Sequence, residues 1–459
     1  MSKHLLTNRL LFVAAFSVLF VTGAAPPAVA AQSAASESAA SIDTGDTAWI
    51  LVSTALVLFM TIPALALFYG GLVRTKNVLS VLMQCLALTA LMTIVWVVCG
   101  YTLAFSTANS EGVNQFIGGF SNLMMNGVDA SSVYVTSEEG SPAVGIPQVL
   151  FAVFQMTFAV ITPALMIGAF AERMKFSAVL AFSAVWLLVV YVPICHMTWG
   201  GGLYSKWGVM DFAGGIVVHV TAGIGALVAC IMIGPRAGYP RELEPPHNMT
   251  MTVTGTAMLW VGWFGFNAGS ALGANGDAAM ALFATHLSAS VATLVWMAIE
   301  WFKLGKPSVL GAATGAIAGL AAITPASGYV GPMGALVIGA ASAALCFVFA
   351  TTIKRKFGYD DSLDVFGVHG VGGFLGTILC GVFASTMFGG NANGEASYSI
   401  GSHLVTQITG AMTAAVYTAI ATFVILKLVD LVIGLRVDVN TETKGLDLIE
   451  HEERGYILY

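Results

Sequence analysis

Residues 364–383 read DVFGVHGVGGFLGTILCGVF, an apolar, glycine-rich run that carries Asp364 and His369. A helix that crosses a bilayer needs about 20 apolar residues, and this run supplies them. An ionisable residue inside such a helix is energetically costly and marks a candidate functional site. The stretch therefore predicts a membrane helix whose histidine has a role of its own.

The composition of the whole chain is that of a membrane protein. It has 459 residues, of which 57% are hydrophobic and 9% are charged, whereas a soluble domain has about 25% charged residues. The net charge of -6 says little about partners, but the sequence has no basic cluster that suggests nucleic-acid binding. The six cysteines stand in or beside apolar runs without CxxC spacing. We interpret them as packing residues, and we expect no metal site and no cofactor.

The N-terminus is typical of a secretory signal peptide. Basic residues precede the apolar stretch at 10–25, and an AVA sequence at 28–30 offers a cleavage site. A first membrane helix is the alternative, but the Pro-Pro pair at 26–27 and the polar sequence after it favour cleavage. We expect residues 1–30 to be removed and residues 31–47 to form a polar extracytoplasmic segment.

The rest of the chain predicts an all-α polytopic membrane protein with about eleven spans, each long enough for a hydrocarbon core of ~30 Å. With the mature N-terminus outside, an odd number of spans places the C-terminus in the cytoplasm. Residues 48–436 would then form the membrane domain and residues 437–459 a cytoplasmic tail. The expected spans cover roughly residues 48–70, 78–105, 147–171, 176–197, 211–233, 249–272, 279–302, 308–325, 330–352, 363–388 and 403–435.

The distribution of basic residues tests this topology independently. Cytoplasmic loops are enriched in Lys and Arg, which is the positive-inside rule. The expected outer segments hold only Lys206, and the long outer loop near residues 106–146 is acidic. The pattern supports a multi-pass protein of the cell membrane with its N-terminus outside. The expected inner segments hold Arg74, Lys76, Arg173, Lys175, Arg236, Arg241, Lys303, Lys306, Lys354, Arg355, Lys356, Arg436, Lys444 and Arg454.

Spans five and ten resemble each other. The fifth opens DFAGGIVVHVTAG, with Asp211 and His219, and the tenth opens DVFGVHGVGG, with Asp364 and His369. Each is the fifth helix of a five-helix set, and an odd-sized unit repeated in tandem inserts with opposite orientation. We therefore predict a five-plus-five inverted repeat followed by an extra C-terminal helix. Small-residue ladders predict close helix packing; they are Gly311, Gly315 and Gly319, and Gly372 with Gly376.

The paired histidines suit proton relay or the binding of a small polar molecule, because a neutral imidazole both donates and accepts a hydrogen bond. A core histidine satisfied by a carbonyl is the alternative for each. On one helix, Asp364 and His369 would lie ~7.5 Å and ~140° apart, so they are not direct partners. Asp211 and Asp364 open their helices, and an N-cap is the simplest role for both.

Aromatic residues gather near the expected outer ends of spans three, four and six. An interfacial belt accounts for most of the tryptophans. An aromatic group at one mouth also attracts a small cation by cation–π contact, helped by a hydroxyl. The residues concerned are Phe154, Phe158, Trp199, Trp260, Trp263, Phe264, Phe266 and Ser270.

Six motifs, in order along the chain, resemble the ammonium transporter family, and its bacterial Amt branch rather than its Rh branch. The resemblance spans about residues 48–437. The motifs are LVLFMTIPALALFYGGLVRTKNVLS, HMTWGGG, MDFAGGIVVH, GWFGFNAGS, GLAAITPASGY and DVFGVHGVGG.

The resemblance implies a homotrimer with one pore per subunit in the bacterial inner membrane. By motif position it implies an outer site that recruits ammonium. Trp199, Phe158 and Ser270 correspond to that site, and Asp211 corresponds to a buried aspartate that supports it and helps deprotonation.

The resemblance also implies the path below that site. Phe158 and Phe266 correspond to a stacked phenyl gate. His219 and His369 correspond to twin histidines, hydrogen-bonded to each other, in a hydrophobic pore that Trp263 also lines. Such a pore conducts NH3, with or without a relayed proton.

Three functional classes compete. Transport of ammonium and methylammonium, in the service of nitrogen assimilation, fits the motifs. A membrane enzyme is disfavoured because the sequence has no HExxH, GxSxG or phosphate-loop motif. An ammonium sensor or transceptor that reports through a cytoplasmic partner is the alternative. The resemblance further implies a regulator of the GlnK type, which plugs the inner pore mouths.

Overall fold

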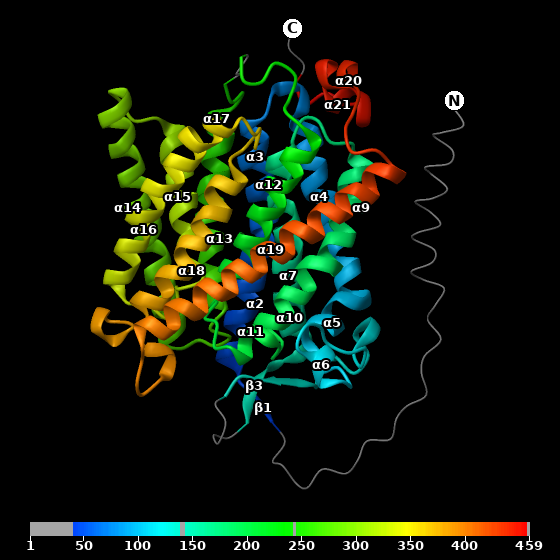
Figure 1. The fold of residues 1–459 in the computed structure, drawn as a ribbon. Helices are drawn as coiled ribbons and strands as arrows, with labels where there is room; N and C mark the ends of the chain where they lie inside the picture. Colours follow the sequence, from blue (N-terminus) through cyan, green and yellow to red (C-terminus); the bar gives the residue numbers. More distant parts are fainter. Residues whose placement is uncertain (1–39, 138–142, 242–244, 457–459) are drawn as a thin grey trace. The chain divides into compact units, whose positions relative to one another are not determined.

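Long apolar helices build the described part of the chain (Figure 1). The structure is a computed structural model that describes residues 40–137, 143–241 and 245–456. The predicted signal peptide at residues 1–30 lies outside the described residues. Residues from Ser41 onward form one packed unit.

In the first half of this unit, several spans combine α-helix with a π-helical turn, a local irregularity that is frequent at functional sites. The elements are α2 (Thr44–Phe59), η1 (Met60–Leu65), α3 (Ala66–Leu72), η2 (Thr75–Asn77), α4 (Val78–Val95), η3 (Trp96–Gly100), α5 (Tyr101–Phe105), α6 (Glu111–Asn114), η4 (Leu123–Met125), α7 (Gln148–Leu165), α8 (Ile167–Phe170), α9 (Phe176–Trp186), η5 (Leu187–Tyr191), α10 (Val192–Trp199), α11 (Leu203–Lys206), η6 (Gly215–Val220) and α12 (Thr221–Ile233).

The second half repeats the pattern and adds a long final helix. Its elements are α13 (Met249–Gly269), α14 (Gly276–Leu304), α15 (Val309–Ile323), α16 (Pro332–Val348), η7 (Phe349–Ile353), α17 (Lys354–Phe357), η8 (Phe366–Gly370), α18 (Val371–Phe383), η9 (Thr386–Phe388), η10 (Ala392–Gly394), α19 (Ile400–Val432), α20 (Val439–Lys444) and α21 (Leu446–Glu450).

The predicted all-α membrane fold is confirmed. Among the described residues, nine helical segments are long and apolar enough to cross a membrane. The other two predicted spans, 249–272 and 308–325, fall on α13 and α15. Neither is among the nine, and α15 has 15 residues. The total of eleven spans therefore stays a prediction.

A small sheet at one end of the unit was not predicted. Strands β1 (Ser41–Ile42), β2 (Val133–Val135) and β3 (Val144–Pro147) pair in the order β1-β3-β2. Runs of two to four residues are too short to show an alternating pattern. The strands lie at one end, which we call the sheet end, while α17, α20 and α21 lie at the opposite end, which we call the tail end (Figure 1).

The two histidine-bearing helices cross at the centre. Turn η6 packs against α18, and η8 packs against α12, which is the reciprocal contact expected of two related halves. Glycine permits this approach, because a Cβ on Gly223 would overlap Gly370 and a Cβ on Gly373 would lie 2.8 Å from the His219 Cβ. The predicted ladder of Gly315 and Gly319 likewise faces α14.

The periphery is formed by longer helices. In the most apolar stretch of α7–α8, 94% of the residues are buried, against 39% for α14 and for α19. Helix α19 has 33 residues, about 50 Å at ~1.5 Å per residue, so it must tilt to fit a bilayer. Figure 1 shows it slanting across the bundle, where it contacts α9, α12 and α18.

Candidate functional site

An aromatic group at the sheet end leads from the surface into the bundle. Trp199, at the end of α10, is partly buried, while Phe158 and Phe266 are each 1% exposed. The Phe158 ring lies edge-on to Trp199, with centroids 5.9 Å apart, and 4.4 Å from the Phe266 ring at 42°. The two phenyl rings are thus in contact but tilted, and both are buried.

Asp211 and Ser270 flank this group. The Trp199 indole N–H donates to the Asp211 carbonyl at 2.9 Å, and the Ser270 hydroxyl donates to the Phe266 carbonyl at 2.8 Å. The buried Asp211 carboxylate accepts four backbone N–H groups at 2.6–3.1 Å, from Gly214, Gly215, Ile216 and Val217. Asp211 therefore caps the turn that carries His219, as the sequence predicted, and its own backbone holds Trp199.

Below the phenyl pair the path narrows between the two histidines. The His219 ring is 6.0 Å from Phe266, 5.6 Å from Trp263 and 5.2 Å from His369, with interplanar angles of 20–25°. The Thr324 hydroxyl joins this group, because the Trp263 indole N–H donates to it at 2.9 Å and His219 Nε2 lies 3.3 Å away. Thr324 was not among the predicted site residues, although it lies in the motif GLAAITPASGY.

The two histidines lie side by side but differ from expectation in one respect. The resemblance implied a hydrogen bond between them. Within the described residues, Nδ1 of both His219 and His369 lacks a partner. The ring planes are nearly parallel, at 20°, and the ring centroids are 5.2 Å apart.

The space around the histidines is small and apolar. A cavity of about 10 Å³ is lined by both histidines, Trp263, Phe266 and seven aliphatic or thioether side chains together with Phe68. That volume is near the least that holds one water. Toward the tail end, His369 also lines a much larger vestibule of about 670 Å³, with Arg236, Lys354 and Asp364 in its wall. His369 therefore borders both the small apolar cavity and the vestibule, which has charged residues in its wall.

The N-cap prediction for Asp364 is wrong. Asp364 has a backbone φ of 60° in the left-handed region, and its carboxylate accepts from Lys354 Nζ at 2.7 Å. Asp361 instead accepts the N–H of Phe366, the first residue of η8, at 2.7 Å. Burial raises the pKa of Asp361 to about 6, although the Lys354 ammonium opposes the shift.

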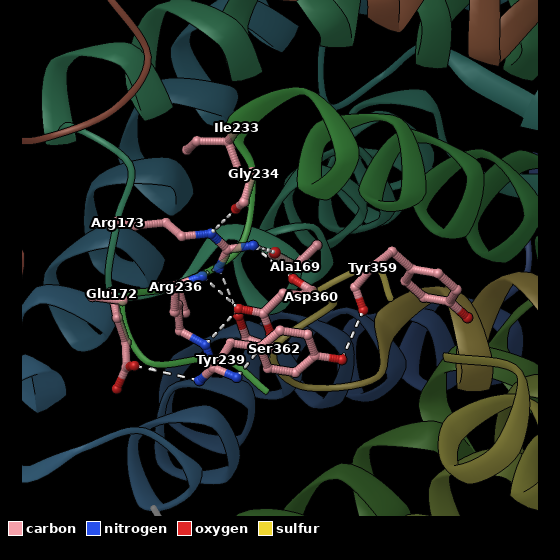
Figure 2. A network of polar contacts seen from close by, with 12 residues as sticks. Ala169, Glu172, Arg173, Ile233, Gly234, Arg236, Tyr239, Tyr359, Asp360 and Ser362 are labelled. Atoms are coloured by element: carbon pink, nitrogen blue, oxygen red, sulfur yellow. Dashed lines mark hydrogen bonds and ion pairs between the residues drawn. The ribbon is translucent and has the colours of Figure 1, made fainter. Parts of the chain in front are cut away.

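A buried network of loop residues at the tail end, which we call the loop network, was not predicted as a unit (Figure 2). Glu172 pairs with Arg74 at 2.9 Å and with Arg236 at 3.3 Å, and Arg236 pairs with Asp360 at 2.9 Å. Burial is the largest influence on the Asp360 carboxyl, but Arg236 outweighs it and lowers the pKa. Since Arg236 also lines the vestibule, the loop network holds part of the vestibule wall in place.

Arg173 is the most enclosed member of the loop network, with no exposed surface. The sequence predicted it only as an inner basic residue. Its guanidinium donates to four backbone carbonyls and one hydroxyl at 2.6–3.1 Å, those of Ala169, Ala171, Gly234, Asp360 and Ser362. It therefore joins the loops that follow α8, α12 and α17.

The tail packs onto the same end. Glu442 accepts from Arg436 at 2.7 Å and from the backbone N–H of Ala237 at 2.7 Å. Asp447 accepts from the N–H groups of Leu79 and Ser80 at the start of α4. The tail is thus bonded to the loop after α12 and to the start of α4.

Comparisons with known proteins agree with these motifs. The profile described as Ammonium Transporter Family matches residues 48–456. An ammonium transporter of Bacillus subtilis (strain 168) is 44% identical over 412 residues, covering 90% of this chain and 98% of the relative. The crystal structure of Saccharomyces cerevisiae Mep2 has a TM-score of 0.76 at 34% identity, covering 87% of this chain and 88% of that one. A sensor Amt protein has a TM-score of 0.79 at 26% identity, covering 89% and 98%. This chain is therefore a multi-pass membrane protein of the ammonium transporter family.

Proposed function

We propose that this protein recruits ammonium at the sheet end, removes a proton there and conducts NH3 past the two histidines. Trp199, Phe158 and Ser270 form the recruitment site, supported by Asp211. Phe158 and Phe266 form the gate. NH3 then crosses the dry section that His219, His369 and Trp263 line. The proton either remains on the side from which ammonium was recruited or crosses separately through a proton relay.

One observation carries this proposal: an unbroken series of ring contacts runs from Trp199 through Phe158 and Phe266 to His219 and His369. The first ring is partly exposed, and the later ones are buried. An intact ammonium ion entering that section would lose its hydration without a counter-charge, at a cost of several kcal/mol or more. A neutral NH3 avoids that cost.

Uptake of radiolabelled methylammonium tests the proposal. Cells without another ammonium transporter should accumulate the label when they express this protein, and unlabelled ammonium should compete. If the protein reaches the membrane but no label accumulates, transport is wrong and the sensor function gains support.

The gate has its own test. Phe266→Ala should open a leak or alter conductance, because the ring that contacts Phe158 at 4.4 Å is removed. The measurement is ammonium- and ion-evoked current in proteoliposomes. Phe264→Ala is the matched control, since Phe264 is on the same helix and faces His286. A Phe266→Ala variant that conducts and selects like wild type contradicts the gate.

Recruitment has a separate test. Trp199→Leu should weaken the apparent affinity for methylammonium by about 2- to 30-fold, corresponding to ~0.5–2 kcal/mol for a cation–π contact. Concentration-dependent uptake measures this. Trp199→Phe keeps an aromatic face but loses the hydrogen bond to the Asp211 carbonyl. This variant therefore distinguishes the contribution of the aromatic ring to affinity from that of the hydrogen bond. An unchanged affinity in Trp199→Leu argues against the recruitment site.

The organisation around the pore is also part of the proposal. Residues 1–30 are a cleaved signal peptide, 31–47 an extracytoplasmic segment, 48–436 the transport domain and 437–459 a cytoplasmic tail. The protein is a homotrimer in a bacterial inner membrane, with the sheet end outside. The basic residues of the inner loops at the tail end support this orientation.

A regulator of the GlnK type is the proposed partner at the tail end, where it would plug the pore mouths. The vestibule offers a wide opening of about 670 Å³ lined by Arg236, Lys354 and Arg355. Co-purification from cells shifted from low to high ammonium should recover such a partner. Its absence under both nitrogen-rich and nitrogen-poor conditions refutes this part of the proposal.

A further inference from the structure

A second cavity at the tail end lies beside the vestibule and is not part of the proposed pore. It has a volume of about 320 Å³ and lies between α14, α15 and the α16–η7–α17 segment. We call it the side pocket. Its wall includes the apolar side chains of Trp296, Leu304, Leu310 and Phe347 and the basic side chains of Lys303 and Arg355. Its size is within the range of small-ligand sites, roughly 300–1,000 Å³.

The basic side chains of the side pocket are not paired with its carboxylates. Two carboxylates line it, but each already has partners: Glu300 accepts from the N–H and the hydroxyl of Ser308 at 2.6 and 3.0 Å, and Asp364 pairs with Lys354. Lys303 and Arg355 form no ion pair with any described residue. Lys303 Nζ lies over the Phe347 ring, 4.9 Å from its centroid. The side pocket therefore has two cationic groups available for an anion.

The surroundings of the side pocket indicate where its ligand comes from. At the end of α14, Trp301, Phe302 and Leu304 are 62%, 92% and 67% exposed. Such an apolar surface beside basic residues is typical of the level where lipid tails meet headgroups. A free anion would use the two cations but not the apolar wall. An acidic phospholipid uses both, since its phosphate pairs with Arg and Lys while its glycerol and acyl chain cover apolar side chains.

We propose that the side pocket binds an acidic phospholipid of the tail-side leaflet, with the phosphate between Lys303 and Arg355 and the acyl chain along Leu304, Leu310 and Phe347. Arg355, Thr314 and Thr351 line both the side pocket and the vestibule. The bound headgroup is therefore separated from the inner mouth of the pore by one layer of side chains.

The test measures binding rather than transport, so it does not depend on the proposed function. The detergent-purified protein is titrated with phosphatidylglycerol, phosphatidylcholine or glycerol phosphate, and the dissociation constant and thermal midpoint are recorded. Wild type should bind phosphatidylglycerol and gain thermal stability, since a ligand that binds only the folded state stabilises it. Phosphatidylcholine and glycerol phosphate should bind at least about tenfold more weakly, because one lacks net charge and the other lacks acyl chains.

The variants identify the site. The double variant Lys303→Gln with Arg355→Gln should weaken phosphatidylglycerol binding at least about tenfold. The exposed pair Lys306→Gln with Lys356→Gln removes the same charge from the same end and should leave affinity unchanged. Lys303→Arg with Arg355→Lys keeps both charges and should bind. Equal affinity of wild type and the Gln double variant overturns the proposal, and so does equal binding of glycerol phosphate or phosphatidylcholine.

Discussion

Replacing either pore histidine with aspartate is expected to admit potassium. His219 and His369 are 1% and 4% exposed and line a cavity of about 10 Å³. In the proposed mechanism an intact cation is excluded there, because it would lose its hydration at a cost of several kcal/mol or more. A carboxylate at either position supplies a counter-charge that offsets this cost. Potassium resembles ammonium in size and charge, so a site that accepts the intact ion should no longer distinguish them.

The measurement is ammonium- and potassium-evoked current in proteoliposomes containing wild type, His219→Asp or His369→Asp. In the aspartate variants we expect potassium current at least about tenfold above that of wild type, which corresponds to ~1.4 kcal/mol. His369→Asn is the uncharged control and should still exclude potassium. Aspartate variants that reject potassium as wild type does would show that the histidines are structural and that no relay passes through them.

The second large effect is expected at Asp211. Asp211→Ala removes the acceptor of four backbone N–H groups at the start of η6. A hydrogen bond to a charged group contributes ~1.5–3 kcal/mol, so we expect a loss of at least ~3 kcal/mol of stability. Since η6 carries His219 and the Asp211 backbone holds Trp199, methylammonium uptake should fall close to background. Uptake and thermal midpoint are measured together.

Asp211→Asn separates capping from charge. The amide keeps one oxygen as an acceptor but carries no charge. If Asp211 is only a cap, Asn should recover most of the stability and the uptake. If the carboxylate also stabilises the cation and its deprotonation, stability should recover while uptake stays low. A wild-type midpoint and wild-type uptake in Asp211→Ala would contradict both roles.

The loop network and the tail lie beside the vestibule at the tail end. Removing one partner of a buried ion pair is strongly destabilising, because the other charge is left without compensation. Arg236 belongs both to this network and to the vestibule wall. Glu442 of the tail accepts from the N–H of Ala237, the residue next to Arg236, and Asp447 accepts from the N–H of Ser80 in α4. The tail is therefore bonded close to the vestibule wall.

The sequence by itself determined the class of the protein, most of its helices and the family. Apolar runs of about 20 residues form helices in a bilayer, because a helix satisfies its own backbone hydrogen bonds where no water is available. The motifs around Trp199, His219 and His369 are local, so they are visible without a structure. The cap at Asp211 was also predictable, because it lies within a few residues of the N–H groups it accepts.

Only the tertiary structure decided the contacts between distant segments. The parallel rings of His219 and His369 come from two crossing helices that lie about 150 residues apart in the chain, and the angle between the rings depends on how glycines let these helices approach. Asp361, rather than the expected Asp364, caps η8. Asp364 has a left-handed backbone, and its carboxylate is paired with Lys354. The bonds of Arg173 join three loops. A sequence pattern records which residues are apolar or charged along one segment, but the partner of a buried polar group is fixed by distance and direction in space.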